Sequence, residues 1–324
     1  MSDVLQIIRN RNILKKLTRE FFERRDYVEV DTPILTVCPG TEVHLNYFET
    51  SWTDHQKIQH QRFLRSSPEL HMKRVVAAGA DRVFQLGPCF RNSGEFSEWH
   101  HPEFHMLEWY QVGLSYEAMI DETENYLRNT AQEMALLTGV DPSRLLPKSF
   151  ERIGVFEAFK SFADLDLVDG DPELAAKAIA KGIISVQPED DFETSYFKVL
   201  IEKIEPVIAS MHGCVLMDYP PSQAALAVVS DSRACRFEYY LGRVELCNGF
   251  FELTGEALNR ERIGEALRQR SSLGYSPVPE DEAFYAAMSK FSNPCSGNAL
   301  GFDRWLALLT GGKSLDRSIT FRNV

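Results

Sequence analysis

The sequence lacks the short patterns of the most common nucleotide-binding and metal-binding proteins. It contains no G-x-G-x-x-G string and no G-x-x-x-x-G-K-[ST] string, so a Rossmann or P-loop nucleotide site is not expected. Its six cysteines form no C-x-x-C pair. A disulfide framework or a structural zinc site is therefore not expected either, and reduced thiols are the default.

Long apolar runs are also missing. No stretch approaches the roughly 20 apolar residues that a membrane-spanning helix needs. Residues 1–16 alternate apolar and charged side chains and do not resemble a signal peptide. We therefore expect a soluble, cytoplasmic protein that makes no membrane contact.

Positive charge is scarce, since 35 Lys and Arg stand against 47 Asp and Glu and give a formal net charge of −12. This balance argues against a surface that grips nucleic acid throughout, because phosphate binding depends on clustered Lys and Arg. A local basic patch remains compatible with the acidic total. The acidic surface suits a basic protein partner or simple solubility equally well.

The 324 residues, 44% of them hydrophobic, are enough for one large domain or for two of about 150 residues each. Apolar periodicity predicts helices over residues 7–25, 115–137, 172–209, 257–273 and from 302 onwards. Strands are predicted over residues 26–33, 83–86, 104–110 and 297–300, with a short strand before a helix that opens near Ser67 and a hairpin over 233–253. This order, without strict βαβ alternation, predicts an α+β fold with an antiparallel sheet flanked by helices.

The richest stretch for chemistry runs from Phe90 to Tyr110. Alternate residues of a strand share a face, so Phe104, Met106, Glu108 and Tyr110 would point one way. A carboxylate is poor core material without a partner, but beside a ring and a phenol it suits a pocket for a cation. A solvated hairpin face is the open alternative, and the spacing of the nearby histidines does not favour zinc.

A second stretch, residues 236–253, carries three glutamates. If residues 241–242 form a two-residue turn, Glu238 lies directly across from Glu245. Facing like charges are destabilising unless a cation offsets them, and Mg²⁺ carrying a nucleotide is the natural candidate. Two exposed glutamates are the alternative. Glu252 has the opposite parity to Glu245, so a pocket that holds both needs a bulge, which we place at residues 248–249.

A third stretch, residues 296–305, predicts a short strand, a glycine and a helix start that puts Arg304 in the first helical turn. Backbone N–H groups and the helix dipole favour an anion there, and the arginine adds a permanent charge. An arginine at this end opposes the dipole, so a purely structural role would be unusual.

Taken together, these stretches resemble the class II aminoacyl-tRNA synthetases, specifically their lysine branch. Residues 27–33, ending at Pro33, resemble the first motif, which builds the dimer interface of that fold. Residues 90–110 resemble the second motif and residues 301–304 the third, and the string Asn-Gly-Phe-x-Glu-Leu at 248–253 is typical of the lysine branch. The resemblance covers nearly the whole chain and implies a single catalytic domain over residues 1–324 and a homodimer.

The anticodon-binding domain of the synthetases has no counterpart before the first motif, so tRNA is not expected as a substrate. A lysine-branch protein of this kind resembles the elongation factor P–(R)-β-lysine ligases. That family activates (R)-β-lysine with ATP as an adenylate and attaches it to a lysine ε-amine of elongation factor P. Residues 67–74, 101–104 and 221–224 are closer to this family, and Ser67, where synthetases usually have alanine, would reshape the wall near a β-amino group.

The resemblance also implies the residues of the ATP site, of which Arg91 and Arg304 would be catalytic. Arg91 would hold the α-phosphate and stabilise the developing charge, with Asn92 beside it. Phe104 would stack on adenine, His100 would touch the γ-phosphate, and Arg304 would lie against the far end of the triphosphate.

Glu238 and Glu245 match the carboxylates that hold Mg²⁺ with ATP. The residues that match the amino-acid pocket are Ser67, Glu69, Glu108, Tyr110, Asn248, Phe250 and Glu252. This pocket contains several carboxylates and no evident arginine, so it suits lysine or (R)-β-lysine and not aspartate.

Two alternatives remain open at this level. One is a lysyl-adenylate-forming enzyme with another acceptor, either tRNA or a small amine. The other is a non-catalytic, amino-acid-binding regulatory paralogue, although Arg91 and Arg304 are both retained. The second motif departs from its usual Arg-Asn-Glu at Ser93 and has a loop one residue longer, and Glu95 is the candidate replacement for the missing carboxylate.

Overall fold

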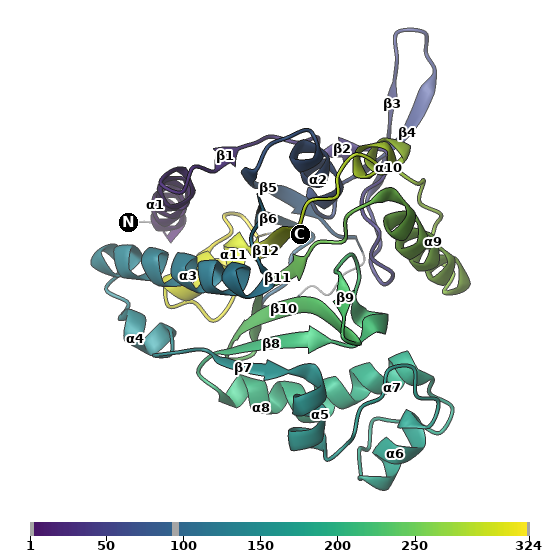
Figure 1. Ribbon diagram of the computed structural model, residues 1–324. Helices are drawn as coiled ribbons and strands as arrows, with labels where there is room; N and C mark the ends of the chain where they lie inside the picture. Colours follow the sequence, from purple (N-terminus) through teal and green to yellow (C-terminus); the bar gives the residue numbers. More distant parts are fainter. Residues whose placement is uncertain (1–2, 93–96, 323–324) are drawn as a thin grey trace. The chain divides into compact units, whose positions relative to one another are not determined.

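The computed structural model describes residues 3–92 and 97–322, and the chain divides into two compact units (Figure 1). Unit 1 comprises residues 1–140 and 252–324, and unit 2 comprises Asp141–Phe251. Ser93 and Glu95, which the second-motif interpretation involves, lie outside the described residues. Within residues 3–92 and 97–322, no helix combines the length and the apolar character that crossing a bilayer requires.

Four strands form the main sheet of unit 1 in the order β1-β5-β6-β12. Their bounds are Val28–Glu29 for β1, Arg82–Phe90 for β5, Glu103–Val112 for β6 and Cys295–Gly301 for β12. β5, β6 and β12 pair antiparallel in one continuous register, in which Val83, Tyr110 and Gly297 lie side by side. The two faces of this sheet therefore carry alternate residues of β6, as the sequence predicts.

One face of this sheet is covered by α1 (Asp3–Glu23) and α3 (Tyr116–Thr138), which pack against each other. An aromatic cluster fills the space beneath them: the ring of Phe22 stacks on Phe84 at 4.8 Å and lies 5.3 Å from Trp109. Both ends of α3 are capped, since the Ser115 side chain accepts a hydrogen bond from the Ala118 N–H and Gly139 adopts a left-handed φ of 70°. This face is the apolar core of unit 1.

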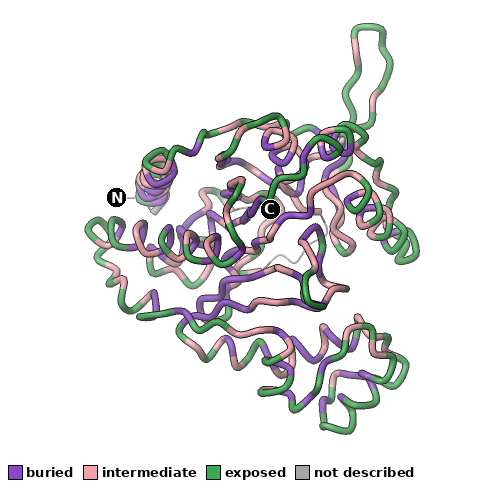
Figure 2. Tube along the Cα trace, in the orientation of Figure 1, coloured by how far each residue is buried: buried purple, intermediate pink, exposed green. Residues whose placement is uncertain are grey.

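The opposite face of the sheet lies against α2 (Glu69–Ala77). The helices α9 (Glu256–Ser272), α10 (Glu282–Met288) and α11 (Phe302–Leu309), with the short 3₁₀ turn η3 (Leu315–Arg317), complete unit 1. In a second sheet of order β2-β4-β3, the β3–β4 hairpin forms an arm that extends away from the rest of the unit (Figure 1). Its strands are β2 (Leu35–Thr36), β3 (Glu49–Thr53) and β4 (Gln59–Leu64), and every residue of β3 is exposed (Figure 2).

Unit 2 is built on strands in the order β11-β10-β8-β7, with β9 paired to β10. The strand bounds are Glu151–Gly154 for β7, Cys214–Tyr219 for β8, Val229–Ser230 for β9, Arg233–Leu241 for β10 and Val244–Phe251 for β11. The helical bounds are Pro142–Leu145 for α4, Val155–Ala163 for α5, Leu174–Ala180 for α6, Phe192–Val199 for α7, Leu200–Ile204 for the π-helix η1, Glu205–Ser210 for α8 and Pro221–Gln223 for the 3₁₀ turn η2. Buried side chains of the α5–α8 region pack against β8 and β10 to form the core of this unit.

The α+β fold class is confirmed, but the prediction of an antiparallel sheet is only partly right. β1 runs parallel to β5, and β7 runs parallel to β8. A parallel pair needs a long crossover connection, and both have one: about 50 residues separate β1 from β5, and α5 to α8 lie between β7 and β8. The sequence pattern predicts strands at β1 and β5 but not the direction in which they pair, and it predicts neither β7 nor β8.

The register predicted for the β10–β11 hairpin is wrong. Leu241 pairs with Val244, so the two turn residues are Gly242 and Arg243, and Gly242 adopts a φ of +55°. Glycine is favoured at this first turn position because hairpin turns need a positive φ there. Glu238 consequently faces Asn248 and not Glu245.

A bulge is present in β11, as the parity of the glutamates requires, but not at residues 248–249. It lies at Leu246, because Tyr239 pairs with Cys247 while Tyr240 pairs with Glu245. The extra residue shifts the pattern by one position. Glu245 therefore returns to the face that carries Tyr240 and Glu238.

Candidate active site

A group of charged side chains, here called the amine pocket, lies in unit 1 between α2, β6 and residue 252. Glu69 and Lys73 are one helical turn apart on α2 and so share a face. The Lys73 Nζ lies 2.6 Å from Glu69 Oε1 and 2.6 Å from Glu252 Oε2. The side chains of Lys73 and Glu252 are only 4% and 3% exposed, so this is a buried ion pair.

Glu108 is the third carboxylate of the amine pocket, and neutral groups hold it. The Tyr110 hydroxyl donates to Glu108 Oε1 at 2.6 Å, and the Ser67 hydroxyl donates to Oε2 at 2.8 Å. Among the described residues, no cation lies within ion-pair distance of Glu108. Burial, reinforced by the charge of Glu69, raises the pKa of Glu108 to about 7.

The ionisable groups of the amine pocket shift one another's pKa values. Burial raises the pKa of Glu252 to about 8, although Lys73 opposes this shift. Burial alone would lower the pKa of Lys73, but Glu252 and Glu69 more than offset it and hold that pKa above its ordinary value. Two carboxyls that hold protons near neutral pH beside a fixed cation can exchange those protons for ammonium groups.

Gly297 makes room for the amine pocket. It sits on β12 directly beside Tyr110 on β6. A Cβ at this position would come within 2.4 Å of both the Glu252 carboxylate and the Tyr110 ring. No other residue type fits here without displacing side chains that form the pocket.

Arg91 and Phe104 also come together in unit 1, as the ATP-site prediction requires. The Arg91 N–H donates to the Pro102 carbonyl at 2.9 Å, and the Arg91 guanidinium carbon lies 5.2 Å from the centre of the Phe104 ring. The Arg91 Nε is buried and has no hydrogen-bond partner among the described residues. A buried donor of this kind fits a phosphate oxygen, because an unpaired buried N–H is otherwise costly.

Arg304 and His100 form the other pair of predicted ATP ligands. Arg304 lies in the first turn of α11, and its Nη2 donates to His100 Nε2 at 2.8 Å while its Nε donates to the Trp99 carbonyl at 3.2 Å. His100 Nδ1 in turn lies 2.8 Å from the Ser97 hydroxyl. These contacts hold the Arg304 side chain beside His100 and Trp99, and the planar guanidinium is suited to binding an anion such as a phosphate.

Asp303, next to Arg304, serves the fold. One carboxylate oxygen accepts a 2.6 Å hydrogen bond from the His105 N–H on β6, and the other pairs with Arg11 on α1. The aspartate therefore fixes the start of α11 to two neighbouring elements. The arginine one residue later is held in place by this arrangement.

The predicted Mg²⁺ carboxylates lie in unit 2 on the β10–β11 hairpin. Glu238 Oε1 accepts from Arg236 Nη2 at 2.6 Å, and Oε2 accepts from the Tyr240 hydroxyl at 2.6 Å. Glu245 lies beside Tyr240 in the register, and Asn248 lies beside Glu238. Within the described residues no group of three or more His, Cys, Asp or Glu side chains is arranged to hold a metal ion.

These two carboxylates nevertheless fit Mg²⁺ that arrives with a nucleotide. Each oxygen of Glu238 accepts only one of the bonds above and so keeps a further lone pair. Mg²⁺ usually takes one or two protein carboxylates and completes its shell with water and phosphate oxygens. The Asn248 Oδ1, which is buried and has no partner within the described residues, adds an acceptor on the same face.

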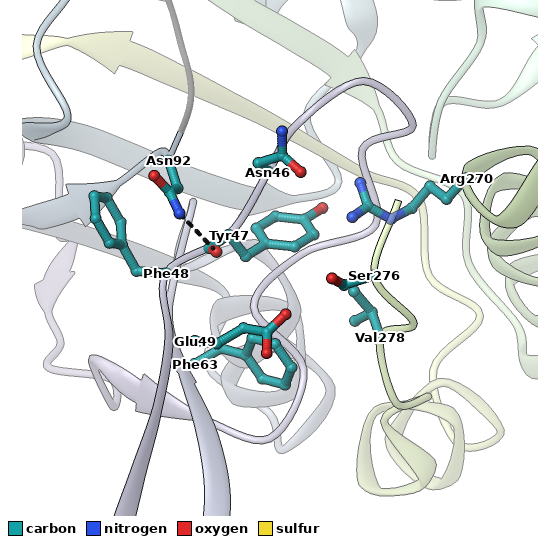
Figure 3. A pocket seen from close by; sticks show the side chains of 9 residues that line it. All are labelled: Asn46, Tyr47, Phe48, Glu49, Phe63, Asn92, Arg270, Ser276 and Val278. Carbon is teal, nitrogen blue, oxygen red and sulfur yellow. Dashed lines mark hydrogen bonds between the residues drawn. The ribbon is translucent and has the colours of Figure 1, made fainter. Parts of the chain in front are cut away.

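Asn92 lies in a different place from the other predicted ATP ligands. It lines a cavity of about 310 Å³ in unit 1, with Tyr47 and Arg270 among the other lining residues (Figure 3). Its amide donates to the Tyr47 carbonyl at 3.5 Å. Arg270 is 3% exposed, lies 4.6 Å from the Tyr47 ring and donates to the carbonyls of Glu42 and Leu45 at 2.6 Å. These contacts fasten residues 42–47 to α9.

Comparison with known proteins decides the family. The sequence model of the tRNA synthetases class II (D, K and N) matches residues 1–324. The elongation factor P–(R)-β-lysine ligase of Hamiltonella defensa is 32% identical over 98% of this chain and 95% of the relative. Those of Vibrio cholerae and Proteus mirabilis are each 34% identical, over 97% and 96% of this chain and 94% of each relative. The chain belongs to this ligase family.

Membership of the ligase family confirms the resemblance drawn from the three motifs. The match covers unit 1 and unit 2, so the amine pocket and the β10–β11 hairpin both lie within it. The structure brings together five of the predicted pocket residues, namely Ser67, Glu69, Glu108, Tyr110 and Glu252. Asn248 and Phe250 lie on β11 in unit 2.

Three residues that shape the site in this chain were not predicted from its sequence. They are Lys73, Gly297 and Asp303. Lys73 could have been found, because it follows Glu69 at the four-residue spacing of a helical ion pair. No comparable sequence signal marks Gly297 or Asp303, whose roles depend on side chains distant in the chain.

Proposed function

We propose that the protein activates (R)-β-lysine with ATP as an adenylate and transfers it to a lysine ε-amine of elongation factor P. The amine pocket is the observation that carries this proposal. It contains three carboxylates and one lysine, of which Glu108, Glu252 and Lys73 are buried and Glu69 is partly exposed. This set of charges suits a substrate with two ammonium groups. The names of the relatives support the same substrate and acceptor.

The reaction needs no nucleophilic side chain from the protein. A substrate carboxylate oxygen attacks the α-phosphorus of ATP and pyrophosphate leaves, which gives the mixed anhydride. The acceptor amine then attacks the carbonyl carbon of this anhydride. An amide bond forms, AMP leaves, and the amine nitrogen loses a proton. The protein contributes by positioning the reactants and stabilising charge.

The chain's own residues have distinct tasks in this scheme. Arg91 binds the α-phosphate and offsets the charge that develops there, and Phe104 stacks on the adenine. Arg304 binds the far end of the triphosphate, next to His100. Mg²⁺, which Glu238 and Glu245 would hold, neutralises phosphate charge when it is bound.

Amino-acid-dependent ATP–pyrophosphate exchange tests the proposal, with (R)-β-lysine, α-lysine and aspartate compared side by side. We expect the fastest exchange with (R)-β-lysine and none with aspartate. Purified elongation factor P should then gain the mass of one β-lysyl group in the presence of ATP. Exchange with α-lysine alone would indicate a lysyl-adenylate former with another acceptor, and no exchange with any of the three would indicate a binding paralogue.

The proposal extends to assembly and location. Apolar side chains are exposed on α1, in the first motif and directly after it, where Val28 is 60% and Val37 is 47% exposed. Exposed apolar side chains that gather in one region are typical of an interface. A cytoplasmic homodimer that does not charge tRNA is the form we propose.

A further inference from the structure

Lys73 is an unexpected occupant of a pocket for ammonium groups. It is itself an ammonium ion, and its Nζ lies 2.6 Å from the carboxylates of both Glu69 and Glu252. Its side chain is 4% exposed, whereas that of Lys177, which also pairs with two carboxylates, Asp171 and Glu173, is 45% exposed. A surface lysine forms such a pair at little cost, but a buried one must be compensated by its surroundings.

The geometry of the Lys73–Glu252 contact differs from that of Lys73–Glu69. Lys73 Nζ donates a directed hydrogen bond to Glu69 Oε1. The contact to Glu252 Oε2 is as short, but its angle is poorer than that of a well-directed hydrogen bond. Lys73 therefore holds Glu252 mainly through its charge, with the hydrogen bond as the smaller contribution.

The formal charges of the amine pocket favour a ligand with two ammonium groups over a ligand with one. Glu69, Glu108 and Glu252 supply three carboxylates and Lys73 supplies one ammonium, so the formal charge is −2. The two ammonium groups of a diamino acid bring this balance to zero, while its carboxylate, which is the group that attacks ATP, lies outside the count. A ligand with one ammonium group leaves a buried carboxylate without a cation, which is strongly unfavourable.

We propose that Lys73 is a built-in counter-ion that sets the charge of the amine pocket to match a substrate with two ammonium groups. It is a positioning residue, since it acts on the substrate through Glu69 and Glu252. The inference rests on the proposed function, because it concerns the amino acid that is activated. The other ionisable groups that face this cluster are Glu108 and Tyr110 on β6 and Cys295 on β12.

The proposal predicts how the pocket handles protons. Without substrate, Glu108 and Glu252 have pKa values raised to about 7 and about 8, so protons partly take the place of the missing ammonium groups. In Lys73→Met one more cation is missing, and the carboxyls hold protons to higher pH. The substrate must then displace those protons in order to bind.

The decisive experiment is the pH profile of kcat/KM for (R)-β-lysine in ATP–pyrophosphate exchange, compared for the wild type, Lys73→Met and Lys73→Arg. In the wild type kcat/KM should rise with pH through the range of these pKa values. In Lys73→Met the rise should move upward by about one pH unit or more, which lowers kcat/KM at pH 7 by about tenfold. Lys73→Arg, which keeps the charge, should retain the wild-type profile, as should Lys177→Met, which breaks an exposed pair of the same pattern.

An unchanged profile in folded Lys73→Met, or an equal shift in Lys73→Arg, would overturn the inference and make Lys73 a merely structural residue. If the wild type itself shows no exchange with any diamino acid, the proposed function fails. That outcome is distinguishable from failure of the Lys73 inference, which requires an active wild type. If Lys73→Met does not fold, calorimetry on the wild type supplies the test. Binding of (R)-β-lysine at pH 7.5, measured in two buffers of different ionisation enthalpy, should release about one proton.

In the same calorimetric measurement, 6-aminohexanoate, which has a single ammonium group, should bind far more weakly and release fewer protons. Equal binding of the two ligands would contradict the charge count. So would binding of (R)-β-lysine without proton release.

Discussion

At the scale of single residues, the three carboxylates of the amine pocket differ in what holds them. Neutral hydroxyls of Ser67 and Tyr110 hold Glu108, whereas the charge of Lys73 holds Glu252. A hydroxyl stabilises an ionised carboxylate less than a full positive charge does. Burial nevertheless raises the pKa of both, to about 7 for Glu108 and about 8 for Glu252, so neither carboxylate is fully ionised until a cation comes with the substrate.

Arg91 should be essential for activation of the amino acid. Arg91→Ala removes the guanidinium that lies beside Phe104, and we expect ATP–pyrophosphate exchange to fall by at least about a hundredfold. Arg268→Ala, at an exposed arginine on α9, is the control and should leave exchange unchanged. Near-normal turnover by Arg91→Ala would refute its assignment to the α-phosphate.

Gly297→Ala should weaken binding of the amino acid and spare ATP. The new Cβ would approach Glu252 and Tyr110 to 2.4 Å, and overpacking of this kind costs about 1–3 kcal/mol. The KM for the amino acid should therefore rise about tenfold or more, while the KM for ATP stays the same. Gly264→Ala in α9 is the matched control, because its Cβ would meet only Arg268 at 3.5 Å. A normal amino-acid KM in Gly297→Ala would show that the pocket is looser than described.

At the scale of elements, sequence patterns predict α1, α3, α9 and the start of α11, but they miss α5 and α10. The stretch predicted as mostly helical over 172–209 is in fact divided, because residues 181–191 between α6 and α7 are not helical. Strand partners are predicted less well. The helix predicted at 115–137 is α3, because an N-cap serine and a C-terminal glycine mark its ends. The hairpin prediction places the turn one residue too early, and such a slip changes every cross-strand pair. β6 is predicted correctly because its two-residue period shows on its own, whereas Gly297 acquires its role only from β6 beside it.

The junction of α1, β6 and α11 should lose stability in acid. Burial, together with the charge of Arg11, lowers the pKa of His105 to about 4 from an ordinary 6.5. The unfolded chain binds the proton more tightly than the folded one does. The contribution of the neutral His105 to the free energy of unfolding is therefore complete above about pH 6.5 and is lost as the pH falls toward 4. Urea denaturation should therefore show up to about 2 kcal/mol less stability from this group at pH 5 than at pH 7.5.

The comparison variant for this experiment is His105→Gln, which should reduce the difference between the two pH values. His55→Gln, at an exposed site on the β3–β4 arm, should not change it. An identical acid response in all three proteins would show that His105 does not carry the effect.

At the scale of the whole molecule, the family of the chain was predictable because three motifs occur in order along it, each of which is weak alone. The division into two units was not predictable, since no linker composition marks residues 141 or 252. Prediction of one catalytic domain over residues 1–324 rests on the resemblance and stays a prediction. The net charge of −12 agrees with the proposal that tRNA is not the acceptor.

Val28→Glu should disrupt the proposed homodimer. Val28, in the first motif, is 60% exposed, and Ile34, Leu35 and Val37, which directly follow the motif, are exposed as well. A charge buried in an apolar interface without a partner opposes association. Sedimentation velocity at micromolar concentration should show a dimer for the wild type and a monomer for the variant. Leu136→Glu, on an 83% exposed residue of α3, should remain dimeric, and a wild type that sediments as a monomer would contradict the proposal.

The way unit 1 is divided along the chain bears on its synthesis by the ribosome. Its amine pocket draws on residues 67–110 and also on Glu252 and Gly297, which are translated only after the whole of unit 2. Chains fold from the N-terminus as they emerge, so a nascent chain that ends before residue 252 lacks two parts of this pocket. Stalled or prematurely terminated products therefore lack the complete pocket, which forms only when the chain is nearly finished.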